Sequence, residues 1–412
     1  MNPLLNKLQP YPFERLRSLL VGVMPAPSLT AINLSIGEPK HPTPQVVTDA
    51  ISANFVGLSS YPATAGTPAL RQAISSWLQR RYQLQALDAD RHVLPVLGSR
   101  EALFALTQVV IDATKASDPP IVIAPNPFYQ IYEGATILAG AQPYYVNQNP
   151  EAGFACDWAS VPANIWTRTQ LVFVCSPGNP TGRVMPLAEW QVLFELSDQY
   201  GFVIAADECY SEIWHTSAPL GALEAAQKLG RDWTRLISFT SLSKRSNTPG
   251  MRSGFVSGDP KLIAAFLLYR TYHGSAMSPM IQAASVAAWN DEEHVSANRV
   301  LYREKFKAVG AILQGEFAVQ QPDAGFYFWL DLRSTLRGLG MAVTGDDQLV
   351  KTWYRDTNVL TLPGSYLSRS VGNDNPGAGF VRLALVEPLD ACVAGAIRIV
   401  NQVRSAMNGA KN

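Results

Sequence analysis

The chain has 412 residues, of which 33 are Lys or Arg and 33 are Asp or Glu, so its formal net charge at pH 7 is zero. This balance excludes the strongly positive surface that binding to nucleic acid or to an anionic membrane requires. The length allows a large core shared between more than one lobe, and no unbroken apolar run approaches the ~20 residues that span a bilayer.

The first ten residues include Pro, Asn and Gln, which interrupt any apolar segment and argue against a secretory signal peptide. The four cysteines are widely spaced without a CxxC pair, a pattern typical of free thiols in a reducing compartment. The five histidines are scattered, and GxSxG, HExxH, GxGxxG and P-loop motifs are absent. We therefore expect a cytoplasmic protein with no metal site, no nucleic-acid partner and no membrane partner.

Residues 1–45 are rich in Pro and short of periodicity, so they indicate an arm and a connector. Within them, Asn33-Leu-Ser-Ile-Gly-Glu-Pro39 is consistent with a strand that ends in a turn, and Gly37 would let a ligand approach the main chain closely. A helix is predicted after Thr67, because Thr67 can cap it, Pro68 suits its first turn, and apolar residues then recur at helical spacing.

Residues 96–104 predict a strand, a glycine turn and a helix. Free amides at the start of a helix attract anions, so Ser99 and Arg100 are expected to offer backbone amides to an anion, while the Arg100 side chain is structural or solvated. Residues 121–129 then predict a buried strand followed by an aromatic turn that contains Tyr129. Packing in the core stays open as an alternative role for this ring.

Two further buried strands end in polar residues. The first leads into Ser176-Pro-Gly-Asn-Pro-Thr-Gly182, where Asn179 is held between Gly and Pro. The second, over 202–206, leads into Asp207 and Tyr210. A carboxylate at the carboxyl end of a strand lies where α/β sheets bind ligands, although Asp207 taken alone could equally cap a helix.

The hydroxyl-rich segment 238–254 follows another buried strand and contains Lys244. A lone lysine after a strand is most often solvated. Here Ser241 and Ser243 offer hydroxyls, and Arg252 offers a planar fork suited to phosphate. A lysine amine beside an anion site suits covalent chemistry with an aldehyde cofactor.

The last third of the chain predicts a second lobe. The charged stretch 290–307, within apolar helical runs over 260–313, is expected to form a hinge helix. Aromatic residues over 322–330 fit either a pocket wall or a core. The apolar strand 379–385 carries one charge, Arg382, which should meet an anion because an unpaired arginine is costly to bury.

These motifs, in this order and over nearly the whole chain, resemble those of the fold-type I pyridoxal-phosphate enzymes, and among them the class I aminotransferases. The resemblance implies an α/β fold with an α/β/α sandwich as the large domain and a smaller α+β domain built from both termini. It implies an N-terminal arm with part of the small domain at 1–45, a large cofactor-binding domain at 46–290 and a C-terminal small domain at 291–412. The implied cofactor is pyridoxal 5'-phosphate, and the substrates are an amino acid and a 2-oxo acid.

The resemblance also implies roles. Lys244 would form the aldimine with the cofactor and act as general base in a ping-pong reaction. Asp207 would keep the pyridine nitrogen protonated, because a nearby negative charge favours the cation. Asn179 and Tyr210 would donate to the phenolate oxygen, and Tyr129 would stack on the ring, where many members have Trp.

The cofactor phosphate would be held by Ser99, Arg100, Ser241 and Arg252, together with Tyr61 of a neighbouring subunit. The implied assembly is therefore a homodimer with shared active sites.

The substrate's α-carboxylate would be bound by Arg382, assisted by Asn179 and by the backbone of Ile36 and Gly37. The family further places cis peptide bonds at positions that match Asn126-Pro127 and Asn179-Pro180.

Within the class, several segments resemble the succinyldiaminopimelate aminotransferases of proteobacteria: 35–44, 98–104, 125–134, 175–182, 207–213 and 241–252. This implies amino transfer between N-succinyl-L,L-diaminopimelate and 2-oxoglutarate, in lysine biosynthesis. The distant carboxylates of that substrate would need a further cation, for which Lys40, Arg270 and His273 are candidates.

Three alternatives remain open from the sequence. The chain could be an aspartate or aromatic aminotransferase, or a carbon–sulfur lyase on the same fold. It could also be the non-catalytic module of a transcription regulator. That class carries a basic DNA-binding domain ahead of the fold, for which we expect no room before the first motif near Asn33.

Overall fold

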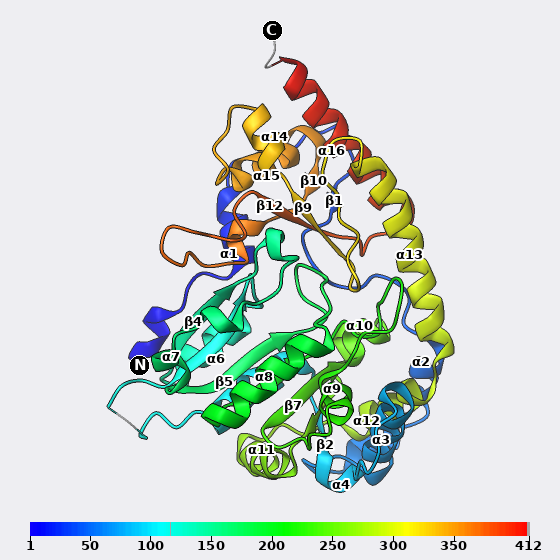
Figure 1. Cartoon of the computed structure of the whole chain (residues 1–412). Helices are drawn as coiled ribbons and strands as arrows, with labels where there is room; N and C mark the ends of the chain where they lie inside the picture. Colours follow the sequence, from blue (N-terminus) through cyan, green and yellow to red (C-terminus); the bar gives the residue numbers. More distant parts are fainter. Residues whose placement is uncertain (116, 410–412) are drawn as a thin grey trace.

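The computed structural model describes residues 1–115 and 117–409. Its centre is a mixed sheet of seven strands in the order β2-β8-β7-β6-β5-β3-β4 (Figure 1). All strands run parallel except β8, which is antiparallel to both of its neighbours. The strands are β2 (Val93–Val96), β3 (Ile121–Asn126), β4 (Gln142–Asn147), β5 (Thr169–Cys175), β6 (Val203–Asp207), β7 (Leu236–Ser241) and β8 (Gly254–Gly258).

Helices cover both faces of this sheet, because the central strands are apolar on both sides. In β5, Val172 and Val174 point into one core while Leu171 and Phe173 point into the other. The helices that contribute to the first core are α3 (Pro68–Tyr82), α8 (Leu187–Tyr200), α9 (Ala222–Lys228) and α12 (Pro279–Asn290). The helices that contribute to the second are α5 (Ser99–Val110), α6 (Ile131–Leu138) and α11 (Pro260–His273).

The smaller lobe combines segments from both ends of the chain. An antiparallel sheet has the order β11-β12-β9, formed by β9 (Tyr327–Asp331), β11 (Leu362–Pro363) and β12 (Phe380–Ala384). A two-residue parallel pair joins β1 (Ile32–Asn33) to β10 (Val359–Leu360). The helices of this lobe are α1 (Pro12–Leu19), α13 (Glu293–Leu313), α14 (Arg333–Gly338), α15 (Asp346–Thr357) and α16 (Leu389–Gly409). A third hydrophobic core contains Leu16, Ile32 and Leu34 beside residues from 306 to 403, so the N-terminal segment packs within the C-terminal lobe.

Shorter helices connect these parts: α2 (Gln45–Ser52), α4 (Ala89–His92), α7 (Ala163–Trp166) and α10 (Leu242–Arg245). Single 3-10 turns lie at η1 (Pro3–Lys7), η2 (Phe55–Ser59), η3 (Pro150–Ala152), η4 (Trp158–Ser160), η5 (Pro249–Met251) and η6 (Gly364–Tyr366). Within 1–115 and 117–409, no helix is both long and apolar enough to span a lipid bilayer.

The structure confirms the predicted α/β class and two of the predicted helices. Helix α3 begins at Pro68, and the Thr67 side chain caps it by accepting a hydrogen bond from the Leu70 amide at 3.3 Å. The hinge helix is α13, which runs along one side of both lobes (Figure 1). We keep the domain boundaries after residues 45 and 290 as a proposal.

Candidate active site

A cavity of about 570 Å³ lies at the carboxyl ends of β5, β6 and β7, between the two lobes. Parallel strands bring their carboxyl ends to one edge of the sheet, and this edge is where α/β folds place ligands. The residues predicted from the sequence that line the cavity are Ile36, Gly37, Ser99, Arg100, Tyr129, Asn179, Asp207, Tyr210, Ser241, Lys244, Arg252 and Arg382. The structure therefore brings together side chains that lie up to about 350 residues apart in the sequence, Ile36 and Arg382 being the extremes.

Lys244 lies on α10, a single helical turn that begins directly after β7. The Ser241 hydroxyl caps this turn by accepting the Ser243 amide hydrogen at 3.1 Å, which aims the lysine into the cavity. The amine donates a hydrogen bond to the Gly37 carbonyl. Burial lowers the pKa of the Lys244 amine to about 8, because desolvation disfavours the charged form. The lysine is therefore closer to a neutral, reactive amine at physiological pH than a surface lysine.

Asp207 ends β6 and is 5% exposed. Its carboxylate accepts the Tyr132 hydroxyl at 2.9 Å and the Cys209 amide at 3.2 Å. Burial raises the pKa of Asp207, and these hydrogen bonds oppose that rise. Across residues 1–115 and 117–409, no Lys or Arg nitrogen lies within 4.0 Å of this carboxylate. Asp207 is thus a buried acid at the cavity wall that lacks a cation of its own.

A second group of donors surrounds the start of α5. Arg252 has a left-handed backbone (φ 52°), and its guanidinium donates to the carbonyls of Leu97 and Pro249 at 3.2 and 3.0 Å. A Cβ at Gly98 would lie 2.5 Å from Arg252 Nη2, so glycine leaves the room that the guanidinium takes. Ser99 and Arg100, the first two residues of α5, line the same cavity, so the free amides of the helix N-terminus lie beside it. This combination of amides and arginine is suited to phosphate.

Arg382 projects from β12 and is 4% exposed. Its Nη1 donates to Asn179 Oδ1 at 3.0 Å, and its Nη2 donates to the Ser35 carbonyl at 2.8 Å. Its Nε is buried and has no partner within the part of the chain that the structure describes. Nothing acidic lies against this guanidinium in that part of the chain, which leaves it available for the carboxylate of a ligand.

The outer wall includes residues that the sequence analysis did not single out. Arg100 Nε donates to the Tyr129 hydroxyl at 2.6 Å, and its Nη2 donates to the Tyr11 hydroxyl at 3.5 Å. Tyr11 directly precedes α1 and lines the cavity, so the arm of residues 1–45 reaches the site. Tyr327 also lines it, and its hydroxyl lies 3.0 Å from that of Tyr210. Only the three-dimensional register of the small lobe brings Tyr327 here.

Comparison with known proteins agrees with this geometry. The family model "Aminotransferase class I and II" matches residues 30–386. The chain belongs to this family. A crystal structure of an aminotransferase from Neisseria meningitidis Z2491 is 50% identical, with a TM-score of 0.93, and covers 98% of this chain and 100% of that one.

Two curated relatives are less similar to the present chain than the Neisseria protein is. The LL-diaminopimelate aminotransferase of Desulforudis audaxviator is 29% identical, with 96% of each chain covered. The 4-dedimethylamino-4-oxo-anhydrotetracycline transaminase OxyQ of Streptomyces rimosus is 31% identical, with 89% of this chain and 92% of its own length covered.

Class I and II aminotransferases use pyridoxal phosphate, and the cavity fits that group. Asp207 is a buried carboxylate with no cation beside it among the residues that the structure describes, which suits a protonated ring nitrogen. Arg252 and the start of α5 suit the phosphate. Lys244 supplies an amine of lowered pKa for the aldehyde carbon. We propose that these groups hold the cofactor, as the sequence predicted.

The candidates for a distant substrate carboxylate need correction. Arg270 is buried, with 1% of its side chain exposed, and pairs with Glu101 at 2.8 Å, so it does not face the cavity. Lys40 pairs with Glu387 instead of lining the cavity. His273 is exposed beside Ser275 at the end of α11. The sequence could not exclude them, because their neighbours Glu101 and Glu387 are distant in the chain.

Two other predictions concern the peptide bonds before proline and the residue Tyr61. The cis peptide bonds at Asn126-Pro127 and Asn179-Pro180 are confirmed, and a third, at Ser176-Pro177, was not predicted. Tyr61 does not line the cavity of its own chain and is fully exposed. Its proposed role depends on a second subunit.

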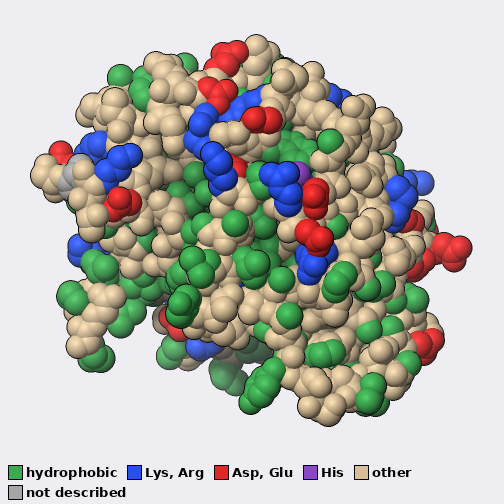
Figure 2. Space-filling model, turned by 90° about the horizontal axis from the view of Figure 1, so that it is seen from below, with side chains coloured by type: hydrophobic (Ala, Val, Ile, Leu, Met, Phe, Trp, Pro, Cys, Tyr) green, Lys and Arg blue, Asp and Glu red, His purple; other side chains and the backbone are tan. Residues whose placement is uncertain are grey.

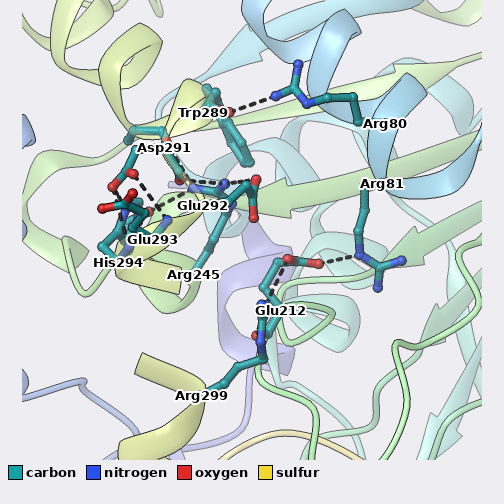
Figure 3. A network of polar contacts seen from close by, with 12 residues as sticks. Arg80, Arg81, Glu212, Arg245, Trp289, Asp291, Glu292, Glu293, His294 and Arg299 are labelled. Atoms are coloured by element: carbon teal, nitrogen blue, oxygen red, sulfur yellow. Dashed lines mark hydrogen bonds and ion pairs between the residues drawn. The ribbon is translucent and has the colours of Figure 1, made fainter. Parts of the chain in front are cut away.

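A polar network fixes the helix that carries Lys244 (Figure 3). The neighbouring Arg245 is buried, and its Nη2 donates to Glu292 Oε1 at 2.6 Å. His294 Nε2 lies 2.8 Å from the Ser246 hydroxyl. Glu292 and His294 lie at the N-terminus of α13. These contacts therefore connect the turn that bears Lys244 to the N-terminal end of the hinge helix.

Proposed function

We propose that this aminotransferase transfers the amino group of N-succinyl-L,L-diaminopimelate to 2-oxoglutarate. Support comes from the similarity to LL-diaminopimelate aminotransferases over 96% of the chain. The six segments that resemble succinyldiaminopimelate aminotransferases add to it. The observation that carries the proposal is a cavity with three arginines, Arg100, Arg252 and Arg382, that have no acidic partner among the described residues, so that two remain for substrate carboxylates once Arg252 is assigned to the phosphate.

In this proposal Arg382 binds the α-carboxylate as a bidentate pair, and Asn179 orients the guanidinium through the bond to its Oδ1. Bound pyridoxal phosphate supplies an electron sink for the electrons of the substrate's Cα–H bond. Lys244, as a neutral amine, would accept the proton from the substrate's Cα and hold it for return to the reacting atoms. Asp207 would keep the ring nitrogen of the bound cofactor protonated, and Tyr210 would donate a hydrogen bond to its phenolate oxygen.

Arg100 is the residue we assign to the distant carboxylate of the succinylated substrate. Within the described residues, the cations that line the cavity are Arg100, Lys244, Arg252 and Arg382. The other three are assigned to the amine chemistry, the phosphate and the α-carboxylate. Arg100 lies at the exposed mouth of the cavity, where Tyr129 and Tyr11 accept its hydrogen bonds. A long substrate would extend in this direction.

The shared active site of a homodimer is part of the same proposal. Tyr61 is fully exposed, and so are large parts of Phe55, Val56 and Leu58 in and beside η2. Figure 2 shows the molecule from below. Hydrophobic side chains gather mainly in the lower half of this view, and charged side chains mainly in the upper half. Such an apolar surface is typical of an interface between subunits.

The test of substrate choice is a panel of amino donors given to the pure holoenzyme with 2-oxoglutarate. N-succinyl-L,L-diaminopimelate should show the highest kcat/KM. Unsubstituted LL-diaminopimelate is the second candidate, favoured by the names of the relatives. Aspartate, tyrosine and cystathionine represent the remaining classes. A higher kcat/KM for any of these than for the succinylated substrate would contradict the proposal.

Two variants test the residues behind it. Arg100→Gln should raise KM for the succinylated substrate about tenfold with little change in kcat, because a charge-assisted hydrogen bond is lost. Lys40→Gln, which alters an exposed cation outside the cavity, is the matched control. Equal effects of both changes would refute the role of Arg100.

The dimer has its own test. Mixing Tyr61→Ala protein with Lys244→Ala protein should restore activity, because one site of each mixed dimer then has both intact residues. No recovery, or a monomer by light scattering, would refute the shared site.

A further inference from the structure

Tyr327 occupies a position where three parts of the active site meet. It lies on β9 and is 3% exposed. Its hydroxyl is 3.0 Å from the Tyr210 hydroxyl, and the Arg382 guanidinium carbon lies 4.3 Å from the centre of its ring. A Cβ at Gly37 would lie 1.8 Å from its hydroxyl oxygen. The same side chain therefore contacts Tyr210, the α-carboxylate arginine and the loop whose carbonyl accepts from Lys244.

The strand register explains why the ring supports Arg382. In the antiparallel pair β12–β9, Ala384 lies opposite Tyr327, and Arg382 lies opposite Trp329. Side chains two residues apart share a face of the sheet, so Arg382 and Tyr327 are diagonal neighbours on one face. The small Ala384 leaves space above the tyrosine ring, and the guanidinium covers it as a cation–π contact.

Which of the two hydroxyls donates the hydrogen bond can be inferred from the other contacts of each oxygen atom. Among the described residues, the one hydrogen-bond partner of the Tyr327 hydroxyl is Tyr210, and Gly37 closes its other side. If Tyr210 donated to Tyr327, the Tyr327 hydrogen would have no acceptor among the described residues, which is costly for a side chain that is 3% exposed. If Tyr327 donates, the Tyr210 hydrogen stays free to point into the cavity, and a hydroxyl that accepts a hydrogen bond is a stronger donor.

We propose that Tyr327 is a positioning residue that donates to the Tyr210 hydroxyl, so that Tyr210 donates into the cavity, while its ring supports the Arg382 guanidinium. The inference rests on the role proposed above for Tyr210. It separates two contributions of one side chain: the hydroxyl acts on Tyr210, and the ring acts on the substrate's α-carboxylate through Arg382.

The test is a pH titration of the absorption of the bound cofactor in the purified holoenzyme, with no substrate present. Tyr327→Phe removes the hydroxyl and keeps the ring. A weaker donor to the cofactor's phenolate oxygen raises the proton affinity of the chromophore, so the midpoint should move up by about 0.5 pH unit. Tyr210→Phe should move it further in the same direction. In the double variant, the Tyr327 change should add nothing to the Tyr210 change.

Tyr302 provides the matched control. It is also a buried tyrosine, its ring stacks on Phe326 at 5.5 Å, and its hydroxyl has no hydrogen-bond partner among the described residues. Tyr302→Phe removes the same atoms without touching Tyr210 and should leave the midpoint unchanged. The other titratable side chains that line the cavity stay the same in all variants: Tyr11, Glu38, Arg100, Tyr129, Cys175, Asp207, Cys209, Lys244, Arg252 and Arg382.

The ring has a separate readout. Tyr327→Leu should raise KM for the amino acid about fivefold more than Tyr327→Phe does, because only the leucine variant loses the cation–π contact. If Tyr327→Phe does not retain the cofactor, 3-fluorotyrosine at position 327 keeps the hydroxyl. Its greater acidity makes it a stronger donor, so the midpoint should move down instead of up.

The outcomes separate the two proposals. If Tyr210→Phe moves the midpoint and neither change at Tyr327 does, the role of Tyr327 is refuted and that of Tyr210 stands. If Tyr210→Phe also has no effect, the inference falls together with the proposed role of Tyr210. An equal shift in Tyr302→Phe would refute the specific contact.

Discussion

The substitution Gly37→Ala tests the geometry of the active site most directly. The added methyl group would displace the Tyr327 side chain, which Tyr210 and Arg382 contact. A Cβ at this position would lie 1.8 Å from the Tyr327 hydroxyl oxygen and 2.7 Å from its Cζ. Real Cβ atoms keep at least 3.0 Å from other atoms, so Gly37→Ala forces a shift of about 1.2 Å. Tyr327 cannot turn away easily, since Tyr210 and Arg382 hold it.

The magnitude follows from the size of that shift. The Gly37 carbonyl accepts the hydrogen bond of the Lys244 amine, so the displacement reaches the base. A misplacement of ~1 Å at a reacting group costs about 100-fold in rate. We therefore expect Gly37→Ala to lower kcat/KM about 100-fold. Overpacking of this kind also costs about 1–3 kcal/mol of stability, which thermal unfolding of the holoenzyme would measure.

A control and a rescue make the reasoning specific. A Cβ at Gly250, close to Lys244 in the sequence, would meet no atom within 4 Å, so Gly250→Ala should leave kcat/KM within about twofold. Adding Tyr327→Phe to Gly37→Ala removes the 1.8 Å contact and leaves the 2.7 Å one, so part of the lost activity should return. Wild-type kcat/KM in Gly37→Ala, or no recovery in the double variant, would refute the steric argument.

Three further predictions concern charged groups. Arg382→Lys should raise KM for the amino acid at least ~10-fold with a smaller effect on kcat, because one ammonium cannot replace a bidentate fork; an unchanged KM would contradict this. Asp207→Asn should lower kcat at least ~100-fold while the Tyr132 hydrogen bond keeps the fold intact, and equal kcat in steady-state assays would contradict it. Burial raises the pKa of Glu208 from 4.5 to about 7, so the folded protein holds this proton more tightly than the unfolded chain does. The stability that this protonation contributes is complete below pH 4.5 and lost as the pH rises through about 7. Glu208→Gln should therefore increase the free energy of unfolding at pH 8 by up to ~3 kcal/mol and leave it unchanged at pH 4.5, as denaturant titration at both values would show.

The position of the principal site residues could be predicted because chain order and sheet topology agree. Asn179, Asp207 and Lys244 each follow a buried strand, and β5, β6 and β7 are parallel neighbours. Any sequence that places polar residues after such strands gathers them at one edge of the sheet. Arg382 was predictable for another reason: a single charge within an apolar strand needs a ligand or a partner.

The remaining site residues depend on contacts that sequence spacing does not encode. Tyr132 lies in a helix, and nothing in its neighbourhood indicates that its hydroxyl reaches Asp207, 75 residues away. Tyr327 reaches Tyr210 through the antiparallel register of the small lobe. The aromatic run that contains Tyr327 fitted a pocket wall and a core equally well, and it serves both uses.

The error at Arg270 has the same origin. An arginine near the expected position was a reasonable candidate, but Glu101 on α5 pairs with it 169 residues away and keeps it buried. Arg100 lines the cavity and has no acidic partner among the described residues, although its side chain was expected to be structural or solvated. It is exposed, but its fork points to Tyr129 and Tyr11, which only folding of the N-terminal arm brings together.

The central claim is that the amine of Lys244 carries the cofactor, and borohydride trapping tests it most directly. The holoenzyme would be reduced, digested and analysed by peptide mass spectrometry. We expect the pyridoxyl group on the peptide that contains Lys244. Lys305 is an internal control, because it is also a buried lysine, 3% exposed, whose pKa burial lowers, but it lies outside the cavity. A label on Lys305 or another lysine, or no label on a protein that transfers amino groups, would contradict the account.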